Sequence, residues 1–151
     1  MSDKLVKMLS TWFYVGDFPA GPGTVASAVG ALMAVICSPS PILYLIVCAV
    51  VTLVGFQVCG RMEELLGKKD PGSVVIDEVA GVMIALFLLP VRWDVILTAF
   101  FLFRAFDMFK IFPVNKFEQM EGAKGIMIDD IVAGVYTNLV MQIALRWSGL
   151  V

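Results

Sequence analysis

The stretch PILYLIVCAVVTLVGFQVCG, residues 41–60, decides how this chain folds, because it runs for twenty residues without a charged side chain. An α-helix needs about 20 predominantly apolar residues to cross the hydrocarbon core of a bilayer. The composition agrees, since 60% of the 151 residues are hydrophobic and 16% are charged, against roughly 45–50% and about 25% in soluble domains. We therefore predict an integral membrane protein.

Four further apolar stretches flank this one, at residues 24–37, 79–89, 95–103 and 126–147. Pro39 and Pro41 separate the first stretch from the second, and Pro90 ends the third, because proline interrupts helices. Stretches shorter than a full crossing are expected to be tilted, partial or buried against neighbours. The sequence predicts an all-α, polytopic integral membrane domain, residues 1–151, with about four to five membrane-embedded helices.

The amino terminus has the pattern of an amphipathic helix. Apolar side chains recur at the i, i+3, i+4, i+7 and i+8 positions, namely Leu5, Met8, Leu9, Trp12 and Phe13. Lys4 and Lys7 lie off this stripe. We expect the helix to lie in the membrane interface. The segment does not end in a small-residue cleavage site, so it does not read as a removable signal peptide.

Small residues within the apolar stretches favour close helix packing. They are Gly30, Gly55, Gly81 and Gly134. The pattern leaves open whether the helices pack within one chain or between two, so the oligomeric state is not determined. The cysteines, Cys37, Cys48 and Cys59, lie in or beside apolar segments and are interpreted as small buried hydrophobic residues.

Charge predicts the orientation of the spans. If the amino terminus lies in the cytoplasm and the chain crosses the membrane five times, nine Lys and Arg residues lie in the cytoplasm: Lys4, Lys7, Arg61, Lys68, Lys69, Arg104, Lys110, Lys116 and Lys124. This topology leaves Arg92 and Arg146 outside, a distribution that follows the positive-inside rule. In this topology the segments 17–24, 77–78, 104–110 and 124–130 reach the same cytoplasmic face, where they can form one site. The basic residues form no continuous stripe, so no nucleic-acid partner is expected.

Two acidic pairs lie at the boundaries of apolar stretches: Asp77 with Glu78, and Asp129 with Asp130. Carboxylates at a membrane boundary are costly, and they repel one another unless a cation neutralises them. Hard oxygen ligands suit Mg²⁺ or another divalent metal, which favours a Mg²⁺ site. The alternative is that the acids only stabilise helix amino termini.

Arg104, Asp107 and Lys110 follow one another at intervals of three residues, so Arg104 and Asp107 share a helix face. An arginine and a lysine beside a metal-bound carboxylate would bind phosphate. Snorkelling and local ion pairing at a helix end are the alternative. The segment GPGT, residues 21–24, leads into a helix, where backbone N–H groups and the Thr24 hydroxyl can meet an anion; a plain turn with an N-cap needs the same residues.

The residue types and motifs that the chain lacks exclude several classes of phosphatase mechanism. The chain contains no histidine, which excludes histidine-dependent phosphatases, and it has neither a C-x5-R nor a D-x-D-x-T pattern. Metal activation of water then remains, in which a cation lowers the pKa of bound water and a free carboxylate takes a proton. Whether water or a carboxylate is the nucleophile stays open.

Four motifs resemble the phosphatidylglycerophosphatase A family: PAGPGTVAS at 19–27, IDEVAG at 76–81, FRAFDMFK at 103–110 followed by Pro113, and GIMIDDIVAG at 125–134. The resemblance implies a bacterial inner-membrane, Mg²⁺-dependent enzyme that hydrolyses the terminal phosphate of phosphatidylglycerophosphate to give phosphatidylglycerol. Ile111 and the segment GAKG, residues 122–125, depart from the family pattern, which bears on loop shape and head-group fit.

The motif residues are assigned the following roles. Asp77, Glu78, Asp129 and Asp130 are expected to hold the metal; Asp129, Asp130, Asp107 and Glu78 to act in catalysis; and Arg104, Lys110 and Thr24 to bind the substrate phosphate. The expected partners are the lipid substrate and the bilayer, with the active site of the multi-pass protein on the cytoplasmic side. A cation transporter is the main alternative, and a non-catalytic membrane subunit is a weaker one because it does not explain the costly acids.

Overall fold

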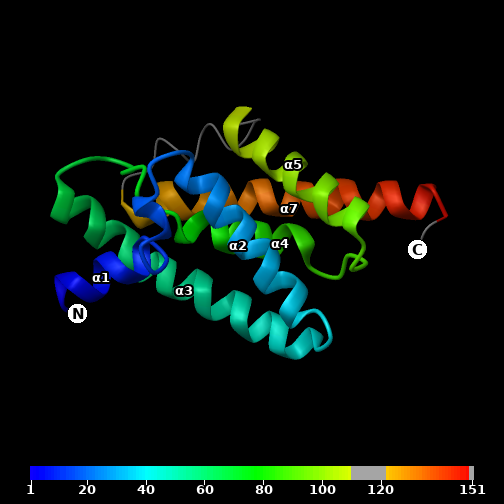
Figure 1. The fold of residues 1–151 in the computed structure, drawn as a ribbon, viewed down its shortest axis with the longest axis horizontal. Helices are drawn as coiled ribbons and strands as arrows, with labels where there is room; N and C mark the ends of the chain where they lie inside the picture. The colour runs from blue at the N-terminus through cyan, green and yellow to red at the C-terminus, as the bar shows by residue number, and fades with distance from the viewer. Residues whose placement is uncertain (110–121, 150–151) are drawn as a thin grey trace.

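The computed structural model describes residues 1–109 and 122–149, and these residues form helices without any strand. In chain order the helices are α1 (Asp3–Ser10), α2 (Pro22–Cys37), α3 (Pro41–Leu66), α4 (Ile76–Leu86), α5 (Trp93–Phe109) and α7 (Ala123–Trp147) (Figure 1). A 3-10 turn, η1 (Val15–Asp17), connects α1 to α2. The predicted all-α class is confirmed.

The ends of α2 and α3 follow from local sequence signals. Gly21 adopts a left-handed conformation, φ 62°, directly before Pro22 begins α2. Pro41 begins α3, where the Ser40 side chain accepts a hydrogen bond from the Leu43 amide, and Gly67 ends it at φ 57°. Proline suits the first turn because its missing N–H is not needed there, and glycine adopts the left-handed end at little cost. The uncharged run 41–60 is therefore helical as predicted, and α3 continues beyond it to Leu66.

The short helix α4 lies at the centre of the fold, where α2, α3, α5 and α7 pack against it (Figure 1). Nine of its eleven residues are buried. Glycines allow the neighbours to approach, since a Cβ at Gly30 of α2 would lie 2.9 Å from the carbonyl oxygen of Val79, and one at Gly134 of α7 would collide with that of Gly81. These small residues therefore pack helices within one chain.

The carboxyl end of α4 differs from the prediction. The apolar run was expected to extend over 79–89, but the helix ends at Leu86, and Leu88 takes a positive φ of 57°. The Tyr44 hydroxyl donates a hydrogen bond to the Met83 carbonyl, and the Asn138 amide donates to the carbonyls of Ala85 and Phe87. Side chains from other helices thus donate hydrogen bonds to backbone carbonyls that a longer α4 would bond to its own amides. The eleven residues of α4 span about 16 Å, which is too short to cross a bilayer core of about 30 Å.

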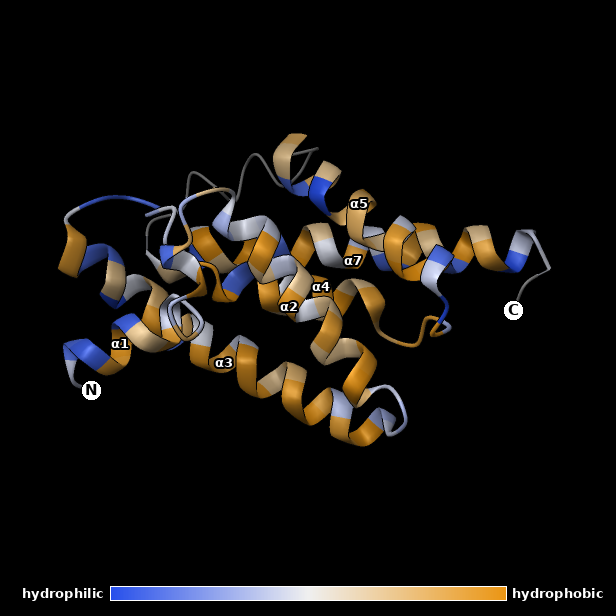
Figure 2. Ribbon diagram, viewed as in Figure 1, coloured by the Kyte–Doolittle hydropathy of each residue, from blue (hydrophilic) through white to orange (hydrophobic). Residues whose placement is uncertain are grey.

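Two of the described helices, α3 (Pro41–Leu66) and α7 (Ala123–Trp147), are long and apolar enough to cross a membrane, judged by length and composition. Figure 2 shows α3 as hydrophobic along most of its length. Large apolar side chains such as Ile42, Leu45 and Leu53 are exposed on it, as a lipid-facing surface requires. The larger number of four to five membrane-embedded helices stays a prediction.

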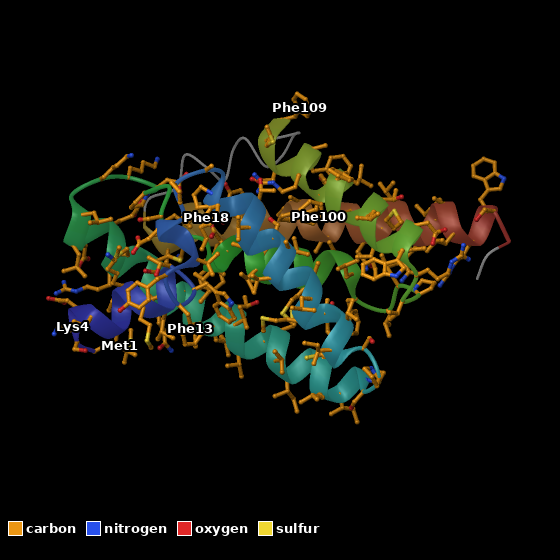
Figure 3. The ribbon with its side chains drawn as sticks, viewed as in Figure 1. Met1, Lys4, Phe13, Phe18, Phe100 and Phe109 are labelled. Atoms are coloured by element: carbon orange, nitrogen blue, oxygen red, sulfur yellow. The ribbon has the colours of Figure 1, made fainter. Side chains whose placement is uncertain are left out.

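The amino-terminal helix is shorter than the predicted stripe. It ends at Ser10, and Trp12, Phe13 and Tyr14 follow with positive φ values of 46°, 55° and 70°. The turn is held by Thr11, whose hydroxyl accepts a hydrogen bond from the Tyr14 amide. Phe13 is therefore not on a helix face, although its side chain is exposed on the outside of the bundle (Figure 3). Placement in the membrane interface stays a prediction.

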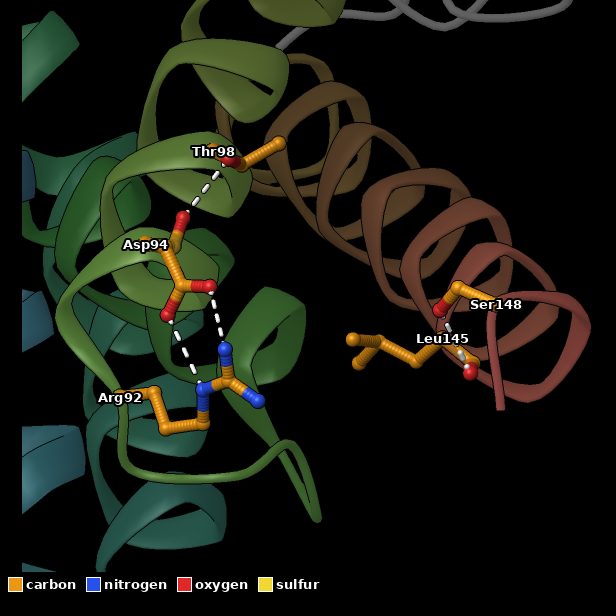
Figure 4. A network of polar contacts seen from close by, with 5 residues as sticks. All are labelled: Arg92, Asp94, Thr98, Leu145 and Ser148. Carbon is orange, nitrogen blue, oxygen red and sulfur yellow. Dashed lines mark hydrogen bonds and ion pairs between the residues drawn. The ribbon is translucent and has the colours of Figure 1, made fainter. Parts of the chain in front are cut away.

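The start of α5 and the end of α7 lie at one end of the molecule (Figures 1 and 4). There the Arg92 guanidinium forms a 2.7 Å ion pair with Asp94, and this hydrogen-bonded contact lowers the pKa of the Asp94 carboxyl. The pair is exposed on both sides. Arg92 and the Arg146 backbone near the end of α7 thus lie away from the amino-terminal ends of α4 and α7, where the predicted acidic site is found.

Candidate active site

The two acidic pairs meet where the first turn of α4 packs against the amino-terminal part of α7. Asp77 and Glu78 lie in that first turn, and Asp129 and Asp130 lie in the second turn of α7. A Cβ at Gly81 would lie 2.8 Å from the Asp130 carbonyl oxygen, which shows how closely the two helices approach. The pairing of α4 with α7 therefore brings together residues that are some fifty positions apart in the sequence.

These carboxyl groups are buried and repel one another. Asp77 and Asp129 are each 8% exposed, and Asp130 is 3% exposed. Asp130 interacts unfavourably with the charges of Asp77, Asp107, Glu78 and Asp129. Four buried carboxylates cannot all remain ionised at such a place without compensating positive charge.

Arg104 of α5 supplies one such charge. Its Nη1 atom lies 2.7 Å from an Asp107 oxygen and 3.6 Å from the Glu78 Oε1 atom. All three side chains are mostly buried, with exposed fractions of 16–18%. The guanidinium therefore links the acidic turn of α4 to the last turns of α5. The predicted face shared by Arg104 and Asp107 is confirmed, whereas Lys110 lies outside the described residues.

The start of α2 completes the surroundings of Glu78. A Cβ at Gly23 would collide with the Glu78 carboxylate, so only glycine leaves room for that side chain at this position. Thr24 is adjacent to Gly23, but its side chain is on an exposed part of the helix. The GPGT segment thus reaches the acidic cluster through Gly23, and the structure places Thr24 at the surface beside it.

Three carboxylate oxygens of the cluster have no hydrogen-bond partner among the described residues: Asp77 Oδ1, Glu78 Oε2 and Asp130 Oδ2. A buried, unpartnered carboxylate oxygen is costly, and a cation removes that cost. Helix capping does not account for these atoms, because they accept no hydrogen bond. The donor chemistry, hard oxygen atoms in a dry site, fits a divalent cation such as Mg²⁺.

The carboxylates are nevertheless not converged around one point. In the part of the chain that the structure describes, no group of three or more acidic or cysteine side chains has the arrangement of a formed metal site. Asp129 Oδ1 instead accepts a 3.1 Å hydrogen bond from the Asp130 amide. A bound cation would therefore require the side chains to rotate toward it.

Sequence reasoning missed Ser27 of α2, which is fully buried and whose hydroxyl has no hydrogen-bond partner in residues 1–109 and 122–149. It belongs to the same PAGPGTVAS motif as Thr24. The available signal was spacing, since Gly23, Ser27 and Gly30 follow the i, i+4, i+7 pattern of one helix face.

The fold and the cluster define a class, a helical membrane-type protein in which buried carboxylates and an arginine gather at one end of the helix bundle. The chain belongs to the phosphatidylglycerophosphatase A family, whose family model matches residues 8–145. Members of this family are phosphatases, so the chain is an enzyme of that kind. The acidic residues and Arg104 all fall within the matched range.

Three relatives illustrate the similarity. The phosphatidylglycerophosphatase A of Haemophilus influenzae is 37% identical over 94% of this chain and 90% of its own length. That of Escherichia coli is 36% identical over 85% of this chain and 76% of its own length. A Bacteroides thetaiotaomicron protein with the provisional name phosphatidylinositol-3-phosphatase is 35% identical over 93% of this chain and 92% of its own. No solved structure matches the chain.

Proposed function

We propose that this protein hydrolyses the terminal phosphate of phosphatidylglycerophosphate to give phosphatidylglycerol, a step of glycerophospholipid biosynthesis. The observation that carries the proposal is the buried cluster of four carboxylates beside Arg104, in a chain whose relatives are named for this reaction. Phosphatidylinositol 3-phosphate is a second candidate substrate, favoured by the provisional name of the Bacteroides relative. Both are lipids with a phosphate monoester.

Mg²⁺ is proposed as the cofactor, held by Asp77, Glu78, Asp129 and Asp130. The unpartnered oxygens of Asp77, Glu78 and Asp130 support this assignment. A bound divalent cation supplies charge neutralisation at the phosphoryl oxygens and lowers the pKa of coordinated water. Its binding would also relieve the repulsion among the acids, which gives the metal a role in stability as well as in catalysis.

The chain's own residues are proposed to bind the phosphate and to move a proton. Arg104 presents a planar guanidinium that suits two phosphate oxygens, and its contacts with Asp107 and Glu78 hold it in place. Asp107 lies 2.7 Å from that guanidinium, so it is near enough to the phosphate position to act as a general base or as a further metal ligand. Burial excludes bulk water and strengthens these interactions.

The protein is proposed to be a multi-pass protein of the bacterial inner membrane, with the active site on the cytoplasmic side. Two helices long and apolar enough to cross, and a short central α4 packed between them, support an embedded bundle. The acids lie near the starts of α4 and α7, whereas Arg92 directly precedes α5, which starts toward the other end of the bundle (Figure 1). The head group would enter at the acidic end while the acyl chains stay among the helices and lipids.

Phosphate release in mixed micelles tests the proposal. Purified wild-type protein, Asp129→Asn and Asp130→Asn are assayed with phosphatidylglycerophosphate, with and without Mg²⁺, and with phosphatidylinositol 3-phosphate in parallel. The matched control is Asp94→Asn, which removes an exposed carboxylate at the far end of the molecule. We expect release that needs Mg²⁺, Asp129 and Asp130 but not Asp94.

Two results would contradict this assignment. Unchanged turnover and metal dependence in Asp130→Asn would remove the acidic cluster from the reaction. Absence of release by folded wild-type protein, together with metal uptake into proteoliposomes, would favour the cation transporter instead.

A further inference from the structure

The Ser27 hydroxyl is a buried polar group on the face of α2 that packs against α4. The residue is fully buried, and its Oγ atom has no hydrogen-bond partner among the described residues. Other buried helix hydroxyls bond to a carbonyl of their own helix, as Ser10 does to Lys7 and Thr137 does to Ala133. Ser27 makes no such bond, so its hydroxyl is available to a group outside α2.

The direction of Ser27 follows from its neighbours on the same helix face. A Cβ at Gly23, one turn before it, would collide with the Glu78 carboxylate. A Cβ at Gly30, one turn after it, would lie 2.9 Å from the Val79 carbonyl oxygen. Residues at i, i+4 and i+7 share one face of a helix, so Ser27 faces the first turn of α4.

That turn already carries the groups of the candidate active site. Glu78 Oε2 is buried and unpartnered like the Ser27 hydroxyl, while Glu78 Oε1 lies 3.6 Å from Arg104. Packing alone does not require a hydroxyl here, because Ala26, Ala31 and Ala34 of the same helix are buried without one. The Ser27 Oγ atom on α2 and the Glu78 Oε2 atom on the turn that it faces both lack a hydrogen-bond partner among the described residues, and Arg104 lies beside Glu78. This arrangement indicates that a polar ligand binds there.

We propose that Ser27 is a substrate-binding residue whose hydroxyl donates a hydrogen bond to a phosphoryl oxygen of the bound phosphate monoester, next to Arg104. The inference rests on the proposed phosphatase function and extends it by one residue. A hydroxyl suits this place because it donates to a phosphate oxygen without adding charge to a buried site. The same chemistry serves the lipid phosphate and the inorganic phosphate product.

Ser27→Ala tests the proposal, with Ser10→Ala as the matched control. Ser10 is also fully buried, but its hydroxyl is bonded to the Lys7 carbonyl. Thermal unfolding is measured for the full-length protein in detergent with Mg²⁺, without and with inorganic phosphate. The KM for phosphatidylglycerophosphate and the inhibition constant for inorganic phosphate are then measured on the same preparations.

The two variants should respond in opposite ways. Ser27→Ala removes an unpartnered hydroxyl, so its Tm without phosphate should be equal to or above the wild-type value, whereas its phosphate-induced rise in Tm should be lost. Its inhibition constant for phosphate and its KM should rise by roughly tenfold or more, the usual effect of a hydrogen bond to a charged group. Ser10→Ala should lower the Tm and leave both constants unchanged.

A lowered Tm in Ser27→Ala with unchanged constants would make the hydroxyl structural and overturn the proposal. A raised inhibition constant with an unchanged KM would restrict the contact to the released product and would overturn substrate binding. If Ser27→Ala does not fold, Ser27→Cys replaces the hydroxyl by a somewhat larger group that is only a weak hydrogen-bond donor, and it should show the same losses. Wild-type protein that binds inorganic phosphate but releases none from lipid would contradict the proposed function and leave the Ser27 contact intact.

Discussion

Asn138, in the middle of α7, donates a 2.7 Å hydrogen bond to the carbonyl oxygen of Phe87, the residue directly after the last residue of α4. A second bond, of 3.0 Å, runs from the same amide nitrogen to the Ala85 carbonyl. In a membrane, carbonyls at the end of a short helix have no water to bond, so a neighbouring helix must supply the donors. This contact ends α4 and thereby helps to hold its acidic first turn against α7.

Asn138→Leu should therefore destabilise the fold. The substitution keeps the side-chain size but leaves the carbonyls of Ala85 and Phe87 without their donor, which costs about 1–3 kcal/mol for an unsatisfied buried group. Thermal unfolding in detergent measures the change. Gln142→Leu is the control, because Gln142 is half-buried and its hydrogen bond to the Leu88 carbonyl is long, 3.5 Å. Equal Tm values for the two variants would show that the Asn138 bonds contribute nothing to stability.

Gly23→Ala should abolish most activity while the protein remains folded. The added Cβ collides with the carboxylate of Glu78, which is the flexible end of a side chain, so Glu78 moves and α2 does not. Alanine also favours a helix over glycine by roughly 0.5–1 kcal/mol. We expect an unchanged or raised Tm with a large fall in kcat for lipid phosphate.

Gly72→Ala is the control for this prediction, since a Cβ at Gly72 meets nothing within 4 Å. A Gly23→Ala protein with full activity would mean that the position of the Glu78 carboxylate does not matter to the reaction.

Arg104→Gln should weaken substrate binding more than Arg104→Lys. Glutamine removes the charge that Glu78 and Asp107 face, whereas lysine keeps the charge but not the planar pair of donors. We expect KM to rise by roughly 10-fold to 100-fold for glutamine, the range of a charge-assisted hydrogen bond. Arg92→Gln, at the exposed ion pair of the opposite end, should leave KM unchanged. A similar KM in all three variants would exclude Arg104 from phosphate binding.

Mg²⁺ should raise the Tm of the wild-type protein, because a ligand that binds only the folded state stabilises it. Asp130→Asn should lose most of that rise, yet its Tm without metal should equal or exceed the wild-type value, since one charge is removed from a repelling group of buried carboxylates. The measurement is a Mg²⁺ titration of thermal unfolding after treatment with EDTA. If Mg²⁺ raised the Tm of Asp130→Asn as much as that of the wild-type protein, Asp130 would not be a metal ligand.

Helices bounded by local signals were predictable. Pro22 and Pro41 mark the starts of α2 and α3, and the apolar runs behind them are helical as expected. The two acidic pairs were also predicted to lie close together, because the expected topology brings their segments to one face, and α4 does pack against α7 at this place. The roles of these residues in metal binding and catalysis remain predictions.

Helix ends and side-chain directions that depend on contacts with other helices were not predictable from the sequence. Residues 87–89 continue the apolar run, yet α4 ends before them because Tyr44 and Asn138 provide donors from distant parts of the chain. The hydroxyl of the PAGPGTVAS motif was assigned to Thr24, whereas the buried one belongs to Ser27. Which of the two faces α4 depends on how α2 rotates in the bundle.

The sequence by itself determined that the chain is helical, rich in apolar surface and equipped with two acidic pairs and an arginine, because hydrophobicity, proline and charge act locally along the chain. Only the tertiary structure decided that α4 is a short central helix, that Arg104 lies beside Glu78, and that Ser27 and not Thr24 is buried. The physical reason is that close glycine contacts and hydrogen bonds between helices determine rotation and depth, and these depend on residues far apart in the sequence.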